Sequence, residues 1–158
     1  MVIVSDGKFK AAVGEVAQQA AQLESVVAIV AWGLAGLEDD IARIVVPNNM
    51  DRMLSLITDL LPIRVLDDGL RQDVSKWASS VRGVYRQRNS ILHSVWIPVD
   101  DDETHMRFDL KPLDRDKGKR TSGEVLSLAN DMEYLATEGA AVFMRRLAHS
   151  TPGPWLVY

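Results

Sequence analysis

One long stretch decides how this chain folds: residues 67–94 read DDGLRQDVSKWASSVRGVYRQRNSILHS. Its apolar side chains recur at three- and four-residue spacing, which is the period of an amphipathic helix. The acidic pair at residues 67 and 68 stands where the amino end of a helix favours carboxylates. On a helical wheel one apolar stripe, roughly 100° wide, contains Leu70, Val74, Trp77, Val81, Val84, Ile91 and Leu92. The pattern predicts a helix that ends at His93 or Ser94 and turns one face toward a core.

Two predicted helices precede this stretch. Residues 8–35 repeat apolar side chains every three or four positions, and residues 50–61 follow two asparagines that offer a cap and end before a proline. Between them, residues 37–46 add a short helical turn. Within the first helix, Val26 to Leu37 is apolar around its full circumference. That segment is expected to be buried on more than one side, in part against a second subunit.

The rest of the chain predicts a hairpin and one more helix. Thr121 with Glu124 forms a capping box, a frequent helix start. In chain order we expect a strand over 95–99, an acidic turn over 100–103, a strand over 106–110, a loop over 111–120, a helix from 121 to 147, and a tail over 150–158 that packs on the body. The expected fold is all-α: a single domain over residues 1–158, built as a four-helix, mostly antiparallel bundle with a small β-hairpin between helices three and four.

The composition limits the class of protein. The chain has 158 residues, of which 18 are Lys or Arg and 22 are Asp or Glu, so its formal net charge is −4. A site for a polyanion must therefore be local. Because the chain has no Cys, thiolate metal sites and a Cys nucleophile are excluded. No apolar run is long enough to cross a bilayer and the amino terminus lacks the pattern of a signal peptide, so we expect a cytoplasmic location and no membrane partner.

A basic polar strip is predicted on the helix of residues 67–94, opposite its apolar stripe. Arg82, Arg86, Asn89 and His93 fall within an arc of about 60° on the helical wheel. An ordinary solvated face explains the two arginines equally well, and a His in the last turn of a helix also suits the helix dipole.

Arg88 falls in the middle of the apolar stripe instead. A guanidinium there is costly unless it meets a carboxylate or an anion. Glu24 lies at the edge of the apolar stripe of the first helix and is the expected structural partner of Arg88. One interpretation is a buried Arg88–Glu24 ion pair that only fixes the register of two helices, and the other is a functional site.

The segment Arg88-Asn89-Ser90-Ile91-Leu92-His93 resembles the signature of HEPN domains, in which an Arg, usually followed by a polar residue, precedes a His by four to six intervening positions. The resemblance implies a metal-independent endoribonuclease of the toxin or defence type, without a cofactor. Such an enzyme cuts RNA by attack of the ribose 2′-hydroxyl on the adjacent phosphate. Arg88 would hold the phosphate, His93 would transfer a proton, and Asn89 would orient either of them.

The resemblance also implies partners. Two copies of the motif would face one cleft in a homodimer, which supplies both a base and an acid, and Arg82 and Arg86 would follow the RNA backbone. An antitoxin or another defence component would be a further partner. Arg86 stands at an allowed spacing from His93 as well, so either Arg86 or Arg88 can be the arginine of the motif. The alternative function is a non-catalytic, HEPN-like dimeric module that binds a nucleotide or a protein.

Overall fold

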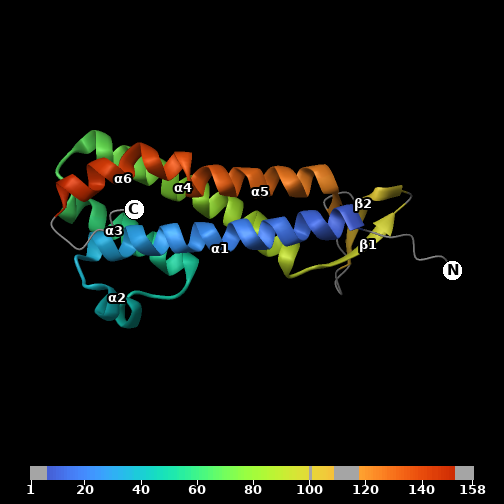
Figure 1. The fold of residues 1–158 in the computed structure, drawn as a ribbon, viewed down its shortest axis with the longest axis horizontal. Coiled ribbons are helices and arrows are strands. Elements are labelled where there is room, and N and C mark those ends of the chain that lie inside the picture. The colour runs from blue at the N-terminus through green and yellow to red at the C-terminus, as the bar shows by residue number, and fades with distance from the viewer. Residues whose placement is uncertain (1–6, 100, 109–117, 152–158) are drawn as a thin grey trace. The chain divides into compact units, whose positions relative to one another are not determined.

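A computed structural model of the chain describes residues 7–99, 101–108 and 118–151. The described part is mainly helical, with a small antiparallel sheet between α4 and α5 (Figure 1). Its elements are α1 (Gly7–Ala35), α2 (Asp39–Val45), α3 (Met50–Arg64), α4 (Asp68–Leu92), β1 (Val95–Val99), β2 (Asp101–Phe108), β3 (Lys119–Thr121), α5 (Ser122–Ala136) and α6 (Glu138–Ser150). The predicted fold class, an all-α bundle with a small β-hairpin, is confirmed.

The chain divides into two compact units. The first contains α1 as far as Ala20 and the residues from Val84 to Met132. The second contains residues Ala21–Gly83 and those from Glu133 onward. Since α1, α4 and α5 each contribute residues to both units, each unit is built around parts of long helices.

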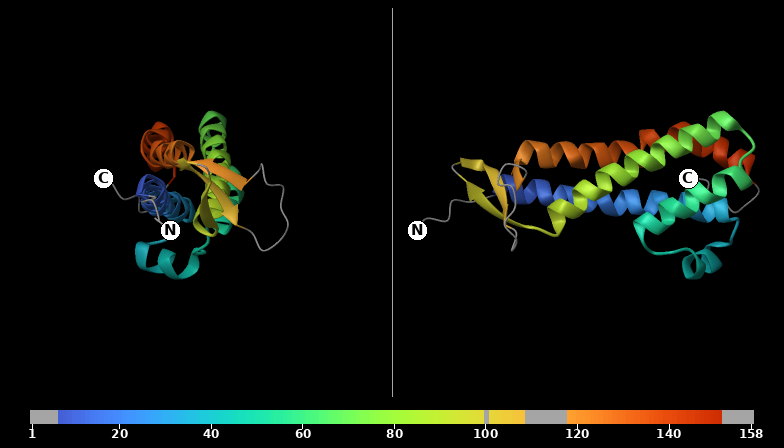
Figure 2. Two further views of the ribbon diagram at one scale, coloured as in Figure 1. Left: turned by 90° about the vertical axis from the view of Figure 1, so that its right-hand side faces the viewer. Right: turned by 180° about the vertical axis from the view of Figure 1, so that it is seen from behind.

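Aromatic rings join the sheet to the helices of the first unit. The buried Phe9 of α1 stacks on the buried His105 of β2, with ring centroids 3.8 Å apart, and also meets the ring of Trp96 at 5.5 Å. The Trp96 indole Nε1 donates a hydrogen bond of 2.9 Å to the carbonyl oxygen of Ile91, in the last turn of α4. These contacts hold the sheet against the beginning of α1 and the end of α4 (Figure 2).

The sheet is larger than the predicted hairpin. Its strands follow the order β1-β2-β3 and all pair antiparallel. The expected acidic turn over 100–103 is wrong because a register shift between Pro98 and Val99 lets Asp101 pair with Val99, so β2 already begins at Asp101. The expected loop over 111–120 is wrong at its end, where Lys119 begins β3 and pairs with Met106. Residues 109–117 lie outside the described part.

The predicted last helix over 121–147 is two helices, α5 and α6, separated at Thr137. The backbone of Thr137 leaves the helical region, with φ −108° and ψ −91°. Its hydroxyl donates to the carbonyl oxygen of Glu133 at 2.8 Å. The Trp77 indole Nε1 donates at 2.9 Å to the carbonyl oxygen of Leu135, which is the acceptor that Gly139 would use in an unbroken helix. A tertiary hydrogen bond therefore accompanies the interruption, which no local pattern predicts.

The other helix ends follow the predicted signals with one exception. Thr121 and Glu124 form the expected capping box: the Thr121 N–H donates to Glu124 Oε2 at 2.8 Å, and the Glu124 N–H donates to Thr121 Oγ1 at 3.1 Å. Asn49 caps α3 through its Oδ1. The prediction that α3 ends at residue 61 is wrong, because Pro62 lies inside its last turn. The proline φ is compatible with a helix, and only one helical hydrogen bond is lost this close to the end.

Asp67 caps the amino end of α4, which begins at Asp68 as the sequence predicts. Its Oδ1 accepts a hydrogen bond of 2.9 Å from the Leu70 N–H, and its Oδ2 lies 3.2 Å from Nη2 of Arg146. The hydrogen bond from Leu70, and then the interaction with Arg146, lower the pKa of Asp67 from its ordinary value of 3.8.

The apolar half of α1 is packed inside the second unit. No side chain from Val26 to Leu37 is exposed, and Arg43 of α2 lies over the Trp32 ring, 5.9 Å from its centroid. Gly36 ends α1 with a φ of 67°, a conformation that favours glycine. No helix in the described ranges is long and apolar enough to cross a membrane.

Candidate functional site

The end of α4 carries the predicted motif residues within the first unit. Asn89 lies one turn before the end of α4, and His93 follows directly after the last helical residue, with its N–H donating to the carbonyl oxygen of Asn89 at 3.2 Å. Both side chains are exposed. Residues four positions apart in a helix lie on the same face, so an amide and an imidazole face solvent side by side.

Arg88 extends from the apolar stripe, where the helical wheel places it, toward the polar strip. Its guanidinium Nη1 donates a hydrogen bond of 3.0 Å to Asn89 Oδ1, and its Cζ lies 5.0 Å from the centroid of the Tyr85 ring. Long basic side chains commonly lay their methylene groups along apolar surface while the charged end reaches a polar neighbour. The half-buried Arg88 therefore directs one end of its guanidinium, Nη1, to the polar strip, while its Nε is buried.

The expected ion pair between Arg88 and Glu24 stays a prediction. Glu24 is half-buried and belongs to the second unit, whereas Arg88 belongs to the first. The hydrogen bond to Asn89 and the stacking on Tyr85 show that Arg88 already has polar and aromatic contacts on its own helix.

The two arginines expected to bind RNA differ in their surroundings. Arg86 is exposed and belongs to the first unit, like Asn89 and His93. Arg82 belongs to the second unit, where its Nε lies 3.8 Å from Asp51 Oδ1. A contact at that distance between partly exposed groups is weak, so it leaves the Arg82 charge available to an anion.

Sequence reasoning missed one arginine that reaches the same turn of α4. Arg107 of β2 donates from Nη1 to Ser90 Oγ at 3.0 Å. Arg107 lies in a segment that the sequence predicts to be a strand. Its contact with Ser90 depends on the strand register, in which Arg107 pairs with Trp96. Two guanidinium groups, from Arg88 and Arg107, thus bind two consecutive residues of α4.

This arrangement suits the binding of a phosphate group. Guanidinium groups donate charge-assisted hydrogen bonds to phosphate oxygens, and an imidazole is a common general acid or base in catalysis. Among the described residues, no group of three or more His, Cys, Asp or Glu side chains could hold a metal ion.

Comparison with models of protein families, with curated proteins and with solved structures finds no match to the chain. The case for a function therefore comes from the side chains at the end of α4.

Proposed function

We propose that the chain is a metal-independent endoribonuclease of the HEPN-like, toxin or defence type, and that it acts as a homodimer on RNA. The observation that carries the proposal is the position of the Arg88 guanidinium. Its Nη1 donates a hydrogen bond of 3.0 Å to Asn89 Oδ1, one helical turn before the exposed His93. Arg88, Asn89 and His93 are the residues on which the resemblance to HEPN domains rests.

In the proposed reaction, the ribose 2′-hydroxyl loses its proton to one His93 and its oxygen attacks the neighbouring phosphorus. The bond from phosphorus to the 5′-oxygen breaks, and that oxygen takes a proton from a second imidazole, His93 of the partner subunit. The products are a 2′,3′-cyclic phosphate and a 5′-hydroxyl. The motif supplies one His per chain, His93, so a reaction that needs two proton carriers needs the dimer.

The arginines have separate tasks in this scheme. Arg88 binds the non-bridging phosphate oxygens as negative charge grows on them, and Asn89 fixes the direction of the guanidinium. Arg86 contacts the neighbouring phosphates of the RNA backbone. Arg107, bound to Ser90, adds a second positive charge beside the same turn of α4.

The test is cleavage of a mixture of structured and single-stranded RNAs in the presence of EDTA. His93→Ala and Arg88→Ala should each lower the cleavage rate by a factor of about 10² to 10⁴. A matched control is His149→Ala, because His149 is also an exposed histidine in the last turn of a helix, with its Nδ1 2.6 Å from the Arg145 carbonyl oxygen. That variant should cleave like the wild type.

Substrates modified at one position complete the test. An RNA with a single 2′-deoxyribose at the scissile position should resist cleavage there, and the wild-type products should carry cyclic phosphate ends. Dependence on Mg²⁺, cleavage at the deoxyribose position, or full activity in His93→Ala would each overturn the proposal. Binding of RNA without any cleavage would favour the non-catalytic module instead.

A further inference from the structure

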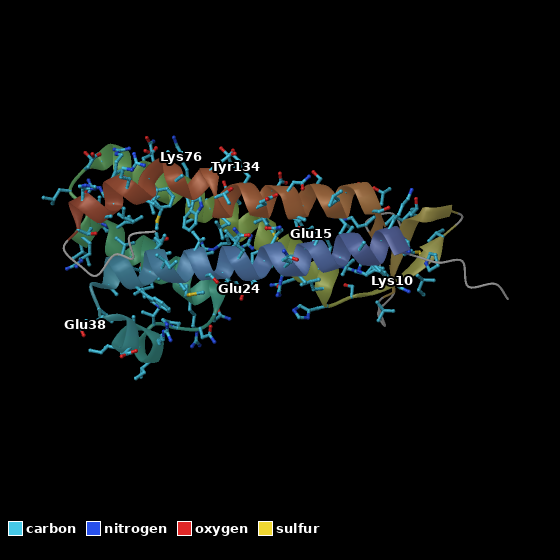
Figure 3. All side chains as sticks on the ribbon, in the orientation of Figure 1. Lys10, Glu15, Glu24, Glu38, Lys76 and Tyr134 are labelled. Carbon is cyan, nitrogen blue, oxygen red and sulfur yellow. The ribbon has the colours of Figure 1, made fainter. Side chains whose placement is uncertain are left out.

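An open groove of about 640 Å³ lies between the first turns of α1 and of α5 in the first unit. Its α1 side is lined by Lys8, Ala11, Ala12 and Glu15, and its α5 side includes Gly123 and Leu126. Figure 3 shows that Glu15 and Lys10 project from different sides of α1, so Lys10 does not share the groove face.

The groove is lined in part by small residues, with one exposed leucine beside them. Ala11, Ala12 and Gly123 are small, so the middle of the groove admits a side chain from another molecule. Leu126 stands at the same surface and is 45% exposed, whereas the other two leucines of α5, Leu128 and Leu135, are buried. A protruding leucine beside a hole lined by small residues is the geometry of a knob and its hole. When both lie on one surface, a two-fold axis can fit each copy into the other.

The charges at the two ends of the groove are also complementary. Lys8 and Glu15 are seven positions apart, so they lie on one face of α1, two turns from each other. Glu15 accepts a hydrogen bond of 2.7 Å from Nε2 of the buried Gln19, which fixes its carboxylate near one end. If two copies pair with their α1 helices antiparallel, Lys8 meets Glu15 of the partner subunit, and the reverse contact forms by symmetry.

We propose that this groove is the surface through which two copies of the chain form a homodimer. The occupant of each groove is Leu126 of the partner subunit, with two Lys8–Glu15 ion pairs at the ends. The surface differs from the one expected at Val26–Leu37, where half-buried residues such as Ile29 and Trp32 alternate with buried ones. It belongs to the same unit as His93.

The inference does not rest on the proposed ribonuclease function, because its readout is molecular mass. Light scattering at micromolar concentration should give a particle of twice 17.6 kDa for the wild type. Lys8→Glu and Glu15→Lys each place like charges at both ends of the interface, so each should weaken self-association by about 100-fold. Lys10→Glu changes an exposed lysine of the same helix outside the groove and should remain a dimer.

Mixing the two charge variants gives the sharpest result. The Lys8→Glu chain carries two acidic groups along the groove and the Glu15→Lys chain carries two basic ones, so the mixture should form a heterodimer although neither chain pairs with itself. The double variant with both changes should be a homodimer again. If the groove instead binds some other molecule, neither the heterodimer in the mixture nor the homodimer of the double variant should form.

Filling the groove with a larger side chain is a second, independent test of the proposed interface. A Cβ atom at Gly123 would meet only Thr121 Oγ1, at 3.8 Å, so Gly123→Leu should fold normally and block the entry of Leu126 of the partner subunit. Gly14→Leu is the matched control, since a Cβ atom there has no neighbour within 4 Å and the position lies outside the groove. Circular dichroism checks that both variants are folded. A monomeric wild type, a dimeric Gly123→Leu, or mixed charge variants that stay monomeric would each overturn the inference.

Discussion

Replacing Trp77 with Phe tests why the last helical region is divided into α5 and α6. Trp77 is 5% exposed, packs edge-on against Phe143 at 5.1 Å, and donates its indole N–H to the Leu135 carbonyl oxygen at 2.9 Å. Phenylalanine keeps an aromatic ring in this place but lacks the donor. The substitution therefore isolates the hydrogen bond at the interruption, together with a modest loss of buried volume.

The magnitude follows from these contacts. Leaving the buried Leu135 carbonyl without its donor costs about 1–3 kcal/mol. The smaller ring removes a few buried carbon atoms, which adds about 1 kcal/mol. The free energy of unfolding should fall by about 2–4 kcal/mol, and at about 2–4 °C per kcal/mol for a chain of this length the Tm should drop by roughly 5–15 °C.

Thermal and urea unfolding followed by circular dichroism measure this loss. Trp32→Phe is the matched control, because Trp32 is only half-buried and its ring contact with Arg43, at 5.9 Å, is worth about 0.5–1 kcal/mol. If Trp77→Phe loses no more stability than Trp32→Phe, the hydrogen bond to Leu135 does not stabilise the interrupted helix and the explanation given for Thr137 is wrong.

Three further predictions concern single side chains. Thr121→Ala removes one half of the capping box with Glu124 and should lower the free energy of unfolding by about 1 kcal/mol, measured by urea titration; no change would mean that the box does not stabilise α5. Because the folded-state pKa of Asp67 lies below its ordinary value of 3.8, its carboxylate stabilises the fold above that pH and the contribution is lost as pH falls through the lowered pKa. The stability difference between the wild type and Asp67→Asn should therefore shrink on acidification below about pH 4, and a difference that grows would contradict the sign. Asn89→Asp should bind the Arg88 guanidinium more tightly, because the aspartate carries a full negative charge that competes with an RNA phosphate. RNA affinity measured by fluorescence anisotropy should therefore fall about five- to tenfold. Unchanged affinity would argue that Arg88 does not contact phosphate.

Much of the fold could be predicted because its signals are local. The apolar period of α4 places its ends within a residue or two, and Thr121 with Glu124 marks the start of a helix through bonds between neighbours. The interruption at Thr137 could not be predicted in this way. The donor that takes the Leu135 carbonyl, Trp77, stands 58 positions earlier in the chain.

The candidate site was predicted in its residues but not in its geometry. A helical wheel gives the direction of a Cα–Cβ bond, and it placed Arg88 correctly among apolar neighbours. It does not follow a long side chain, which here bends past Tyr85 to reach Asn89. Arg107 was missed for a different reason, because a contact between a strand and a helix depends on pairing register, which the alternation of side chains in a short strand leaves open.

The stacking of Phe9 on His105 has a spectroscopic consequence. The two ring planes are inclined by only 18° with centroids 3.8 Å apart, so the imidazole carbon-bound protons lie over the face of the benzene ring. Circulating π-electrons of that ring shield them, and their proton resonances should move upfield of those of the exposed His93 and His149. The chemical shifts of the His105 ring protons therefore report, in solution and without a label, whether the sheet packs against α1.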